Sequence, residues 1–426
     1  MKTLSFLATP ALPDRYRIAP DAAALCLYFL ASLADGALMP FFALWAQHEA
    51  HIPLRFVGLL LACYAGGELI ATPLLGGIAD RFGRRPVLLC SSLGVGSGFV
   101  LLAHLHGALA IALCLMAIGV FECALHPTIS SVIGDTVPAE KLRMRYASAR
   151  TASGLGRVIG PALGAALALW SLSAVFIGCG ISLLCAAVLI ISTLPETRLS
   201  NADPSGAARE DDDEEGLSTL LPAFRDRRLA ALLLWFAIIE IVSGWPEFIT
   251  PPYARETDAL SASGIGLLFT YAAVVGVILQ WPISKLTAKV PTISLLMAAG
   301  VAVTGGFGLL LIHPNSITLY ASATLLSVAQ VLFGPLVPVT VNAMAPPAAR
   351  ASYMAAISTV NDLEDTAGPA SGMYLYSLSP RLPWLVGMPI VLLAALALGM
   401  SIRRSERSGS PAGIPDRAHV RVPPGA

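Results

Sequence analysis

Residues 231–241 read Ala-Leu-Leu-Leu-Trp-Phe-Ala-Ile-Ile-Glu-Ile, and Glu240 is the one charged side chain among them. A strand of a membrane β-barrel alternates apolar and polar residues over about ten positions, so this continuous run predicts a helix. The whole chain has the same character: of its 426 residues 56% are hydrophobic and 13% are charged, and the mean hydropathy is +0.72. This composition excludes a soluble enzyme with a polar surface and predicts an integral membrane protein.

The sequence contains twelve apolar runs, each long enough to cross a bilayer, which takes about 20 residues. They cover residues 22–46, 54–76, 86–105, 108–134, 147–170, 173–194, 229–250, 262–284, 292–312, 317–343, 352–378 and 384–402. We therefore expect an all-α membrane protein with twelve transmembrane helices. Polar residues separate the sixth run from the seventh, so we expect a six-helix half at 1–194, a linker at 195–228, a second six-helix half at 229–402 and a tail at 403–426.

An internal repeat supports the division into halves. At an offset of 208 residues, Gly160-Pro161-Ala162-Leu163-Gly164 aligns with Gly368-Pro369-Ala370-Ser371-Gly372. The same offset pairs Pro127 with Pro335, Pro138 with Pro346 and Gly36 with Gly244. Four matches at one offset indicate two pseudo-symmetric halves, an architecture of transporters whose substrate site lies between the halves near the midplane of the membrane.

Basic residues predict the orientation. If both termini lie in the cytoplasm, 23 of the 27 Lys and Arg residues fall on that side, as the positive-inside rule requires. We therefore expect a multi-pass protein of the inner (plasma) membrane with cytoplasmic termini, linker and tail. The net charge is zero, so no overall field attracts nucleic acid. The acidic string at 210–215 is either a solvated segment or a partner-binding one, and its role stays open.

The cysteines argue against a disulfide framework and a metal site. All seven lie in apolar stretches and none forms a Cys-x-x-Cys pair: Cys26, Cys63, Cys90, Cys114, Cys123, Cys179 and Cys185. The sequence also lacks a nucleophile elbow and a phosphate-binding loop. We expect no metal, no cofactor and no enzymatic activity.

The segment after the second apolar run reads Gly76-Gly77-Ile78-Ala79-Asp80-Arg81-Phe82-Gly83-Arg84-Arg85-Pro86. This Gly-x-x-x-Asp-Arg-x-Gly-Arg-Arg pattern resembles the signature of the major facilitator superfamily. The resemblance implies a twelve-helix transporter in which Asp80 latches onto the eleventh helix while the outside is open, and in which Arg84 pairs with an acid at the end of the fourth helix, where Asp135 stands. The alternative is that the basic residues Arg81, Arg84 and Arg85 only set the topology.

The fifth run contains Gly156-Arg157-Val158-Ile159-Gly160-Pro161-Ala162-Leu163-Gly164. Its Gly-x-x-x-Gly-Pro-x-x-Gly pattern resembles the antiporter signature of the drug:proton antiporter branch of the superfamily. Small residues at this spacing also allow close packing of helices, which is the alternative role of Gly156, Gly160, Pro161 and Gly164. One departure from the branch is Met116, which stands where many proton-coupled members have an arginine.

Ionisable groups at membrane depth cost about 2.5–3.5 kcal/mol each, which makes them candidates for function. Runs 1, 4, 7 and 10 resemble the helices that line the central cavity of the superfamily, and near their middles lie Asp35, Glu122, Glu240 and Gln330. Asp35-Gly36 followed by Pro40 resembles the acidic motif of the drug exporters. Further candidates are His126, Arg157, Glu68, Asp362, Glu364 and Asp365.

Glu122 and His126 are four residues apart, so we expect them on one face of a helix, where the pair could exchange protons with either side of the membrane. For His126 the alternative is a hydrogen-bonded packing residue beside Pro127. Arg157 is expected to neutralise a nearby acid.

These features predict a secondary transporter that exports small amphipathic or cationic compounds in exchange for protons by alternating access. The alternative is proton-coupled symport, the uptake of a specific metabolite. The expected partners are a small-molecule substrate, protons and the lipid bilayer, and one chain is expected to work as a monomer. The substrate itself, facilitated diffusion and the acid that carries the proton stay open.

Overall fold

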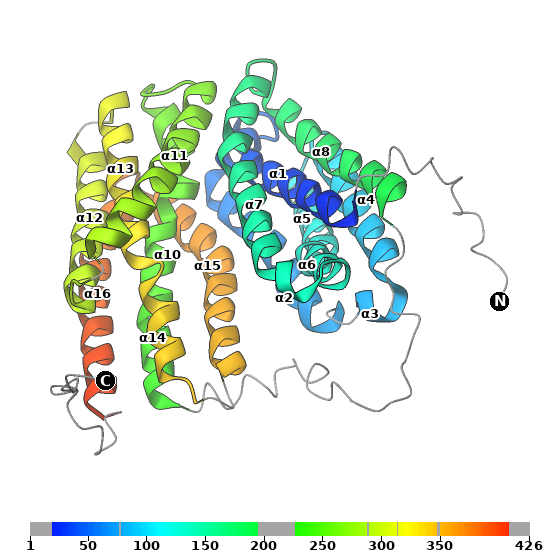
Figure 1. Ribbon diagram of the computed structural model, residues 1–426. Coiled ribbons are helices and arrows are strands. Elements are labelled where there is room, and N and C mark those ends of the chain that lie inside the picture. Colours follow the sequence, from blue (N-terminus) through cyan, green and yellow to red (C-terminus); the bar gives the residue numbers. More distant parts are fainter. Residues whose placement is uncertain are drawn as a thin grey trace, which may run out of the picture.

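The computed structural model describes residues 19–75, 78–194, 226–287, 289–312, 314–346 and 350–408. In these ranges all regular secondary structure is helical (Figure 1). The first group of helices is α1 (Pro20–His48), α2 (Leu54–Leu75), α3 (Ile78–Phe82), α4 (Arg84–Leu102), α5 (Ala108–Glu122), α6 (Leu125–Thr136), α7 (Ala139–Leu167) and α8 (Leu172–Thr193). The second group is α10 (Arg227–Glu256), α11 (Ala262–Thr287), α12 (Thr292–Ile312), α13 (Ser316–Phe333), α14 (Leu336–Met344), α15 (Arg350–Leu378) and α16 (Leu382–Ser408).

Ten stretches within these ranges are long and apolar enough to cross a membrane. Two of them combine a pair of helices, α5 with α6 and α13 with α14. The two remaining long helices, α7 and α15, have 29 residues each and are not apolar enough to belong to this set. The protein is therefore an all-α membrane protein, and the number of twelve crossings stays a prediction.

The predicted apolar runs at 108–134 and 317–343 each fall within one candidate membrane span, and each span is interrupted by a turn. The first stretch breaks between Glu122 and Leu125, and the second breaks between Phe333 and Leu336. Proline explains both positions. Pro127 has no backbone N–H to donate to the carbonyl group four residues earlier, and Pro335 interrupts the second stretch in the same way.

Helices α1–α8 gather on one side of the molecule and helices α10–α16 on the other (Figure 1). Helices α1, α2 and α7 of the first group contact α10, α15 and α11 of the second group, respectively. We call the face where α1 begins and α16 ends the terminal side. On the opposite side, Gln47 Nε2 at the end of α1 donates a hydrogen bond to Glu256 Oε1 at the end of α10, at 3.2 Å.

Glycines let the two groups approach closely near that opposite side. A Cβ atom added to Gly58, at the start of α2, would lie 2.2 Å from the carbonyl oxygen of Pro369 in α15. A Cβ atom on Gly266, at the start of α11, would lie 2.6 Å from the carbonyl oxygen of Pro161 in α7. No side chain fits at these two crossings, which hold the groups together away from the terminal side.

Candidate functional site

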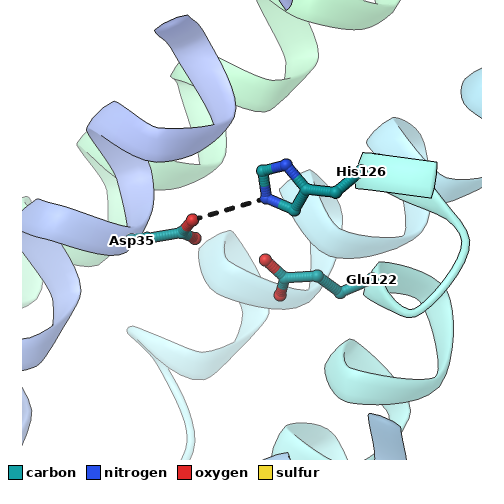
Figure 2. Close-up of side chains that lie close together, drawn as sticks. All are labelled: Asp35, Glu122 and His126. Carbon is teal, nitrogen blue, oxygen red and sulfur yellow. Dashed lines mark ion pairs between the residues drawn. The ribbon is translucent and has the colours of Figure 1, made fainter. Parts of the chain in front are cut away.

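Three side chains that can carry charge meet inside the first group of helices (Figure 2). Asp35 lies on α1, Glu122 is the last residue of α5 and His126 is near the start of α6. One ligand atom of each residue lies within 4.8 Å of the others, and His126 Nε2 is 3.7 Å from Asp35 Oδ2. We call these residues the Asp–Glu–His cluster. Its groups can bind a proton, a positively charged group or a cation.

The break between α5 and α6 shapes this cluster. The sequence predicted that Glu122 and His126 share one face of a continuous helix, but they lie on two helices joined by a turn. Their side chains still point toward one another and toward Asp35 (Figure 2). The turn that Pro127 imposes therefore places the pair, and Asp35 approaches from α1, far away in the sequence.

Two tyrosines hold the cluster in place. The hydroxyl group of Tyr64 on α2 donates a hydrogen bond of 2.5 Å to Glu122 Oε2. The ring of Tyr28 on α1 stacks on the His126 ring with centroids 5.7 Å apart, and its hydroxyl group donates to the His126 carbonyl oxygen at 3.2 Å. Both tyrosines restrict the positions of the groups they contact.

Burial differs within the cluster. Glu122 is only 5% exposed, while the side chains of His126 and Asp35 are 34% and 25% exposed. A ligand can reach Asp35 and His126 directly. Glu122 is buried and much less accessible.

A second set of charged groups lies where the two groups of helices face each other. Glu68 on α2 interacts electrostatically with Asp362 and Asp365 on α15, and Glu247 on α10 interacts with Asp365 and Arg157. Glu68, Glu247 and Asp365 are exposed side chains on helices of the two groups that face each other. We call the region between these facing helices the central space.

Arg157 was expected to neutralise a nearby acid. It lies on α7 and is exposed, and it forms no ion pair with any residue that the structure describes. Its electrostatic neighbours are Glu247 and Asp365 of the other group of helices. Arg157 is thus a positive group held across the central space from acids, without a direct contact.

Glu240 and Gln330 do not join the Asp–Glu–His cluster. The carboxyl group of Glu240 on α10 interacts electrostatically with that of Glu364 on α15. Gly244 makes room for this arrangement, because a Cβ atom there would lie 2.6 Å from Glu364 Oε1. Gln330 is exposed near the end of α13.

The glycines of the fifth apolar run pack α7 against α1. A Cβ atom on Gly156 or Gly160 would lie 2.6 Å from the carbonyl oxygen of Phe29 or Leu33, respectively. A Cβ atom on Gly164 would lie 2.5 Å from the ring of Phe41. The motif therefore has a packing role, and the helix that it supports is the one that carries Asp35.

The structure describes only part of the loop signature that follows α2. Arg84 Nε lies 3.2 Å from Asp135 Oδ2, the pairing that the resemblance implied, and Arg85 Nη2 donates to the Ile191 carbonyl oxygen at 2.9 Å. Gly83 has a φ of 100°, a conformation that favours glycine. Gly76 and the side chains of Asp80 and Arg81 lie outside the described part of the chain. The proposed Asp80 latch therefore remains a prediction.

Sequence reasoning missed three residues of these sites. Glu247 lies seven residues after Glu240, on the same face of α10, and helical spacing could have found it. Tyr64 and Tyr28 left no signal in the sequence, because their contacts with Glu122 and His126 join helices that are distant in the chain.

Comparison with known proteins indicates which protein family the chain resembles. The family model described as Major Facilitator Superfamily matches residues 24–363 and 251–423. Tetracycline resistance protein, class E, of Escherichia coli is 24% identical over 383 residues, covering 88% of this chain and 93% of that protein. Multidrug resistance protein 1 of Bacillus subtilis (strain 168) is 27% identical over 258 residues, covering 59% of this chain and 62% of that protein.

Solved structures share the fold. A bacterial homolog to the human lysosomal transporter Spinster, in an inward-facing and unoccupied conformation, has a TM-score of 0.75 at 16% identity, covering 94% of this chain and 100% of that chain. The nucleoside transporter NupG has a TM-score of 0.73 at 13% identity, covering 92% of this chain and 100% of that chain. At such identities the likeness extends to the fold alone.

Proposed function

Because the chain belongs to the Major Facilitator Superfamily, a family of transporters, we propose that it exports small amphipathic or cationic compounds in exchange for protons. It is a multi-pass membrane transport protein and not an enzyme. Relatives named as tetracycline and multidrug resistance proteins favour export over uptake.

The observation that carries this proposal is the Asp–Glu–His cluster. The carboxyl groups of Asp35 and Glu122 lie so close that they repel each other unless a proton or another positive charge lies between them. A proton and a cationic substrate can therefore compete for the same acids. Such competition is the minimum that an exchanger requires, because each ligand must leave before the other binds.

The acids around the central space provide further negative groups that could attract a cationic substrate. Acids on α2, α10 and α15 face it, with Arg157 as a positive neighbour. An excess of negative groups around an enclosed space attracts cations. In the proposed cycle the two halves rock about their contacts, so that the space opens to one side of the membrane at a time.

The proposed placement follows from the basic residues. The terminal side faces the cytoplasm of a cell whose plasma membrane, or inner membrane, holds the protein, since 23 of the 27 basic residues then lie on that side. One chain contains both halves, so a monomer forms the complete transport unit.

The test is proton movement in liposomes that contain the purified protein and a pH-sensitive dye. A panel of lipophilic cations and common metabolites is added to wild type, Asp35→Asn and Glu122→Gln. Glu140→Gln is the matched control, because Glu140 is an exposed acid at the start of α7, outside the cluster. We expect protons to move opposite to lipophilic cations in wild type and the control, and to stop in both cluster variants.

If protons move in the same direction as a metabolite, the protein is a symporter, and the proposal of export is wrong. Substrate movement without protons would make the protein a facilitator. Unchanged proton flux in Asp35→Asn and Glu122→Gln would remove the cluster from the mechanism.

A further inference from the structure

Two opposite charges occupy equivalent places in the two halves. At the offset of 208 residues that relates the halves, Arg157 on α7 corresponds to Asp365 on α15. Each lies three residues before the glycine of a Gly-Pro pair, which is Gly160-Pro161 in the first half and Gly368-Pro369 in the second. The repeat therefore keeps a charged side chain at this place on both helices and reverses its sign.

These charges attract each other without touching. Arg157 interacts electrostatically with Asp365 and with Glu247 on α10, and all three side chains are exposed. Arg157 nevertheless forms no ion pair with any residue in the described part of the chain. We call Arg157, Asp365 and Glu247 the split charges, because a gap separates the positive group of the first half from the negative groups of the second.

Backbone packing fixes the place of Arg157. A Cβ atom on Gly36 would lie 3.1 Å from the Arg157 Cα atom, and a Cβ atom on Gly156 would lie 2.6 Å from the carbonyl oxygen of Phe29. Helix α7 is thus in direct contact with α1 at this level and cannot move closer to it. Gly36 lies near the middle of α1, so Arg157 lies at the level of the middle of a membrane-spanning helix.

The split charges match a ligand that carries both signs. A charged group at membrane depth is costly unless other groups compensate it. The planar guanidinium group of Arg157 suits a carboxylate, which it can bind through two N–H groups, while the carboxylates of Asp365 and Glu247 attract a cation. A ligand with only a positive charge would satisfy these acids but would be repelled by Arg157.

We propose that the split charges select zwitterionic substrates, with Arg157 binding the anionic group and with Asp365 and Glu247 attracting the cationic group. This inference deepens the proposed export and rests on it for the direction of transport. It narrows the substrate class to amphipathic compounds that carry a carboxylate or a similar anion beside their positive charge. Arg157 is then the residue that distinguishes such compounds from simple cations.

The experiment uses two dyes that differ in one charge. Rhodamine B has a cationic ring system and a carboxylate, and its ethyl ester has the same ring system without the negative charge. Fluorescence anisotropy measures the binding of each dye to the purified protein in detergent, so the result does not depend on a proton gradient. We expect wild type to bind rhodamine B about tenfold more tightly than the ester, the effect of one hydrogen-bonded charge pair.

Substitutions of Arg157 test its role. Arg157→Gln should abolish the preference for rhodamine B, while its affinity for the ester should stay equal or rise because a repelling charge is gone. Binding of the ester thus also shows that the variant is folded. Arg157→Lys should keep a smaller preference, since an ammonium group lacks the paired donors of a guanidinium group. Arg150→Gln is the matched control, because Arg150 is an exposed arginine two turns earlier on α7, and it should keep the wild-type preference.

The acids test the other end of the ligand. The double variant Asp365→Asn with Glu247→Gln should weaken the binding of both dyes by a similar factor, because both dyes carry the cation. Unchanged binding of both dyes in this double variant would overturn the assignment of the cationic end.

Two results would overturn the selection of zwitterions: a wild type that binds the ester as tightly as rhodamine B, and an Arg157→Gln variant that keeps the wild-type preference. Failure of the proposed function would look different. In that case the dye preference would depend on Arg157, and yet no protons would move in liposomes when either dye is added.

Discussion

The two broken helices occupy equivalent places in the two halves and carry different chemistry. Pro127 in the first and Pro335 in the second are 208 residues apart, and each helix breaks beside its proline. At the first break lie Glu122, His126 and Thr128. At the same offset the second break has Gln330, Gly334 and Leu336.

The same difference extends to the neighbours of the breaks. The offset places Ser243 where Asp35 stands and Ala272 where Tyr64 stands, so the second half lacks all the acids of the cluster. The acids of the second half lie elsewhere, and Glu240 on α10 interacts electrostatically with Glu364 on α15. The comparison teaches that the halves share broken helices at equivalent places, while the ionisable side chains belong to each half separately.

The strongest test of this difference between the two breaks is to move the acid from the first half to the second. We expect Glu122→Gln to abolish proton-coupled transport, and we expect the double variant Glu122→Gln with Gln330→Glu to stay inactive. A glutamate at 330 would lack the partners that Tyr64, Asp35 and His126 provide in the first half. Proton flux in liposomes is the measurement, and recovery in the double variant would show that the two breaks are interchangeable.

A second test compares glycines at equivalent places. A Cβ atom on Gly160 would lie 2.6 Å from the backbone of α1, whereas on Gly368 it would lie 3.8 Å from its nearest neighbour. We expect Gly160→Ala to lower stability by about 1–3 kcal/mol, the usual cost of overpacking, and Gly368→Ala to have little effect. Thermal unfolding in detergent measures both variants. Equal losses would contradict the difference in packing.

A third test concerns a contact of the first half on the side opposite the termini. The carboxylate of Glu49, after α1, accepts hydrogen bonds from the backbone N–H groups of Leu172 at 2.8 Å and Ser173 at 3.0 Å, at the start of α8. The offset places Thr257 at the position of Glu49, so the second half has no such carboxylate.

We expect Glu49→Ala to lower stability by about 0.5–2 kcal/mol, because it removes a negative group and two acceptors from a helix N-terminus. Thr257→Ala serves as the control and should change the unfolding temperature less. A Glu49→Ala protein as stable as wild type would show that solvent replaces the carboxylate fully.

The smallest expected effect concerns the pair of Arg84 and Asp135. Both groups are partly exposed, and such ion pairs contribute about 0–1 kcal/mol. The offset places Thr292 and Ala343 at these positions, so the second half has no counterpart. We expect Asp135→Asn to keep the unfolding temperature of wild type within a few degrees and to become indistinguishable from it in high salt. A large loss of stability at low salt would indicate that the pair holds the half together.

Several features of the site could be read from the sequence. The spacing of Glu122 and His126 predicted that they meet, although the helix between them is broken. The glycines at 156, 160 and 164 predicted close packing, and Arg84 with Asp135 followed from the loop signature. The partner of Glu240 could not be read in this way, because Glu364 comes from another helix and reaches it only where Gly244 leaves room.

The sequence by itself determined the fold class, because apolar runs of bilayer length leave the backbone no other way to satisfy its hydrogen bonds than as helices. The prolines alone did not determine where helices break, because Pro161 and Pro369 lie inside continuous helices. Only the tertiary structure decided that Asp35 joins Glu122 and His126, that Tyr64 binds Glu122, and that Arg157 faces Glu247. The physical reason is that side chains from distant helices meet according to helix packing, which depends on many small contacts and leaves no local pattern in the chain.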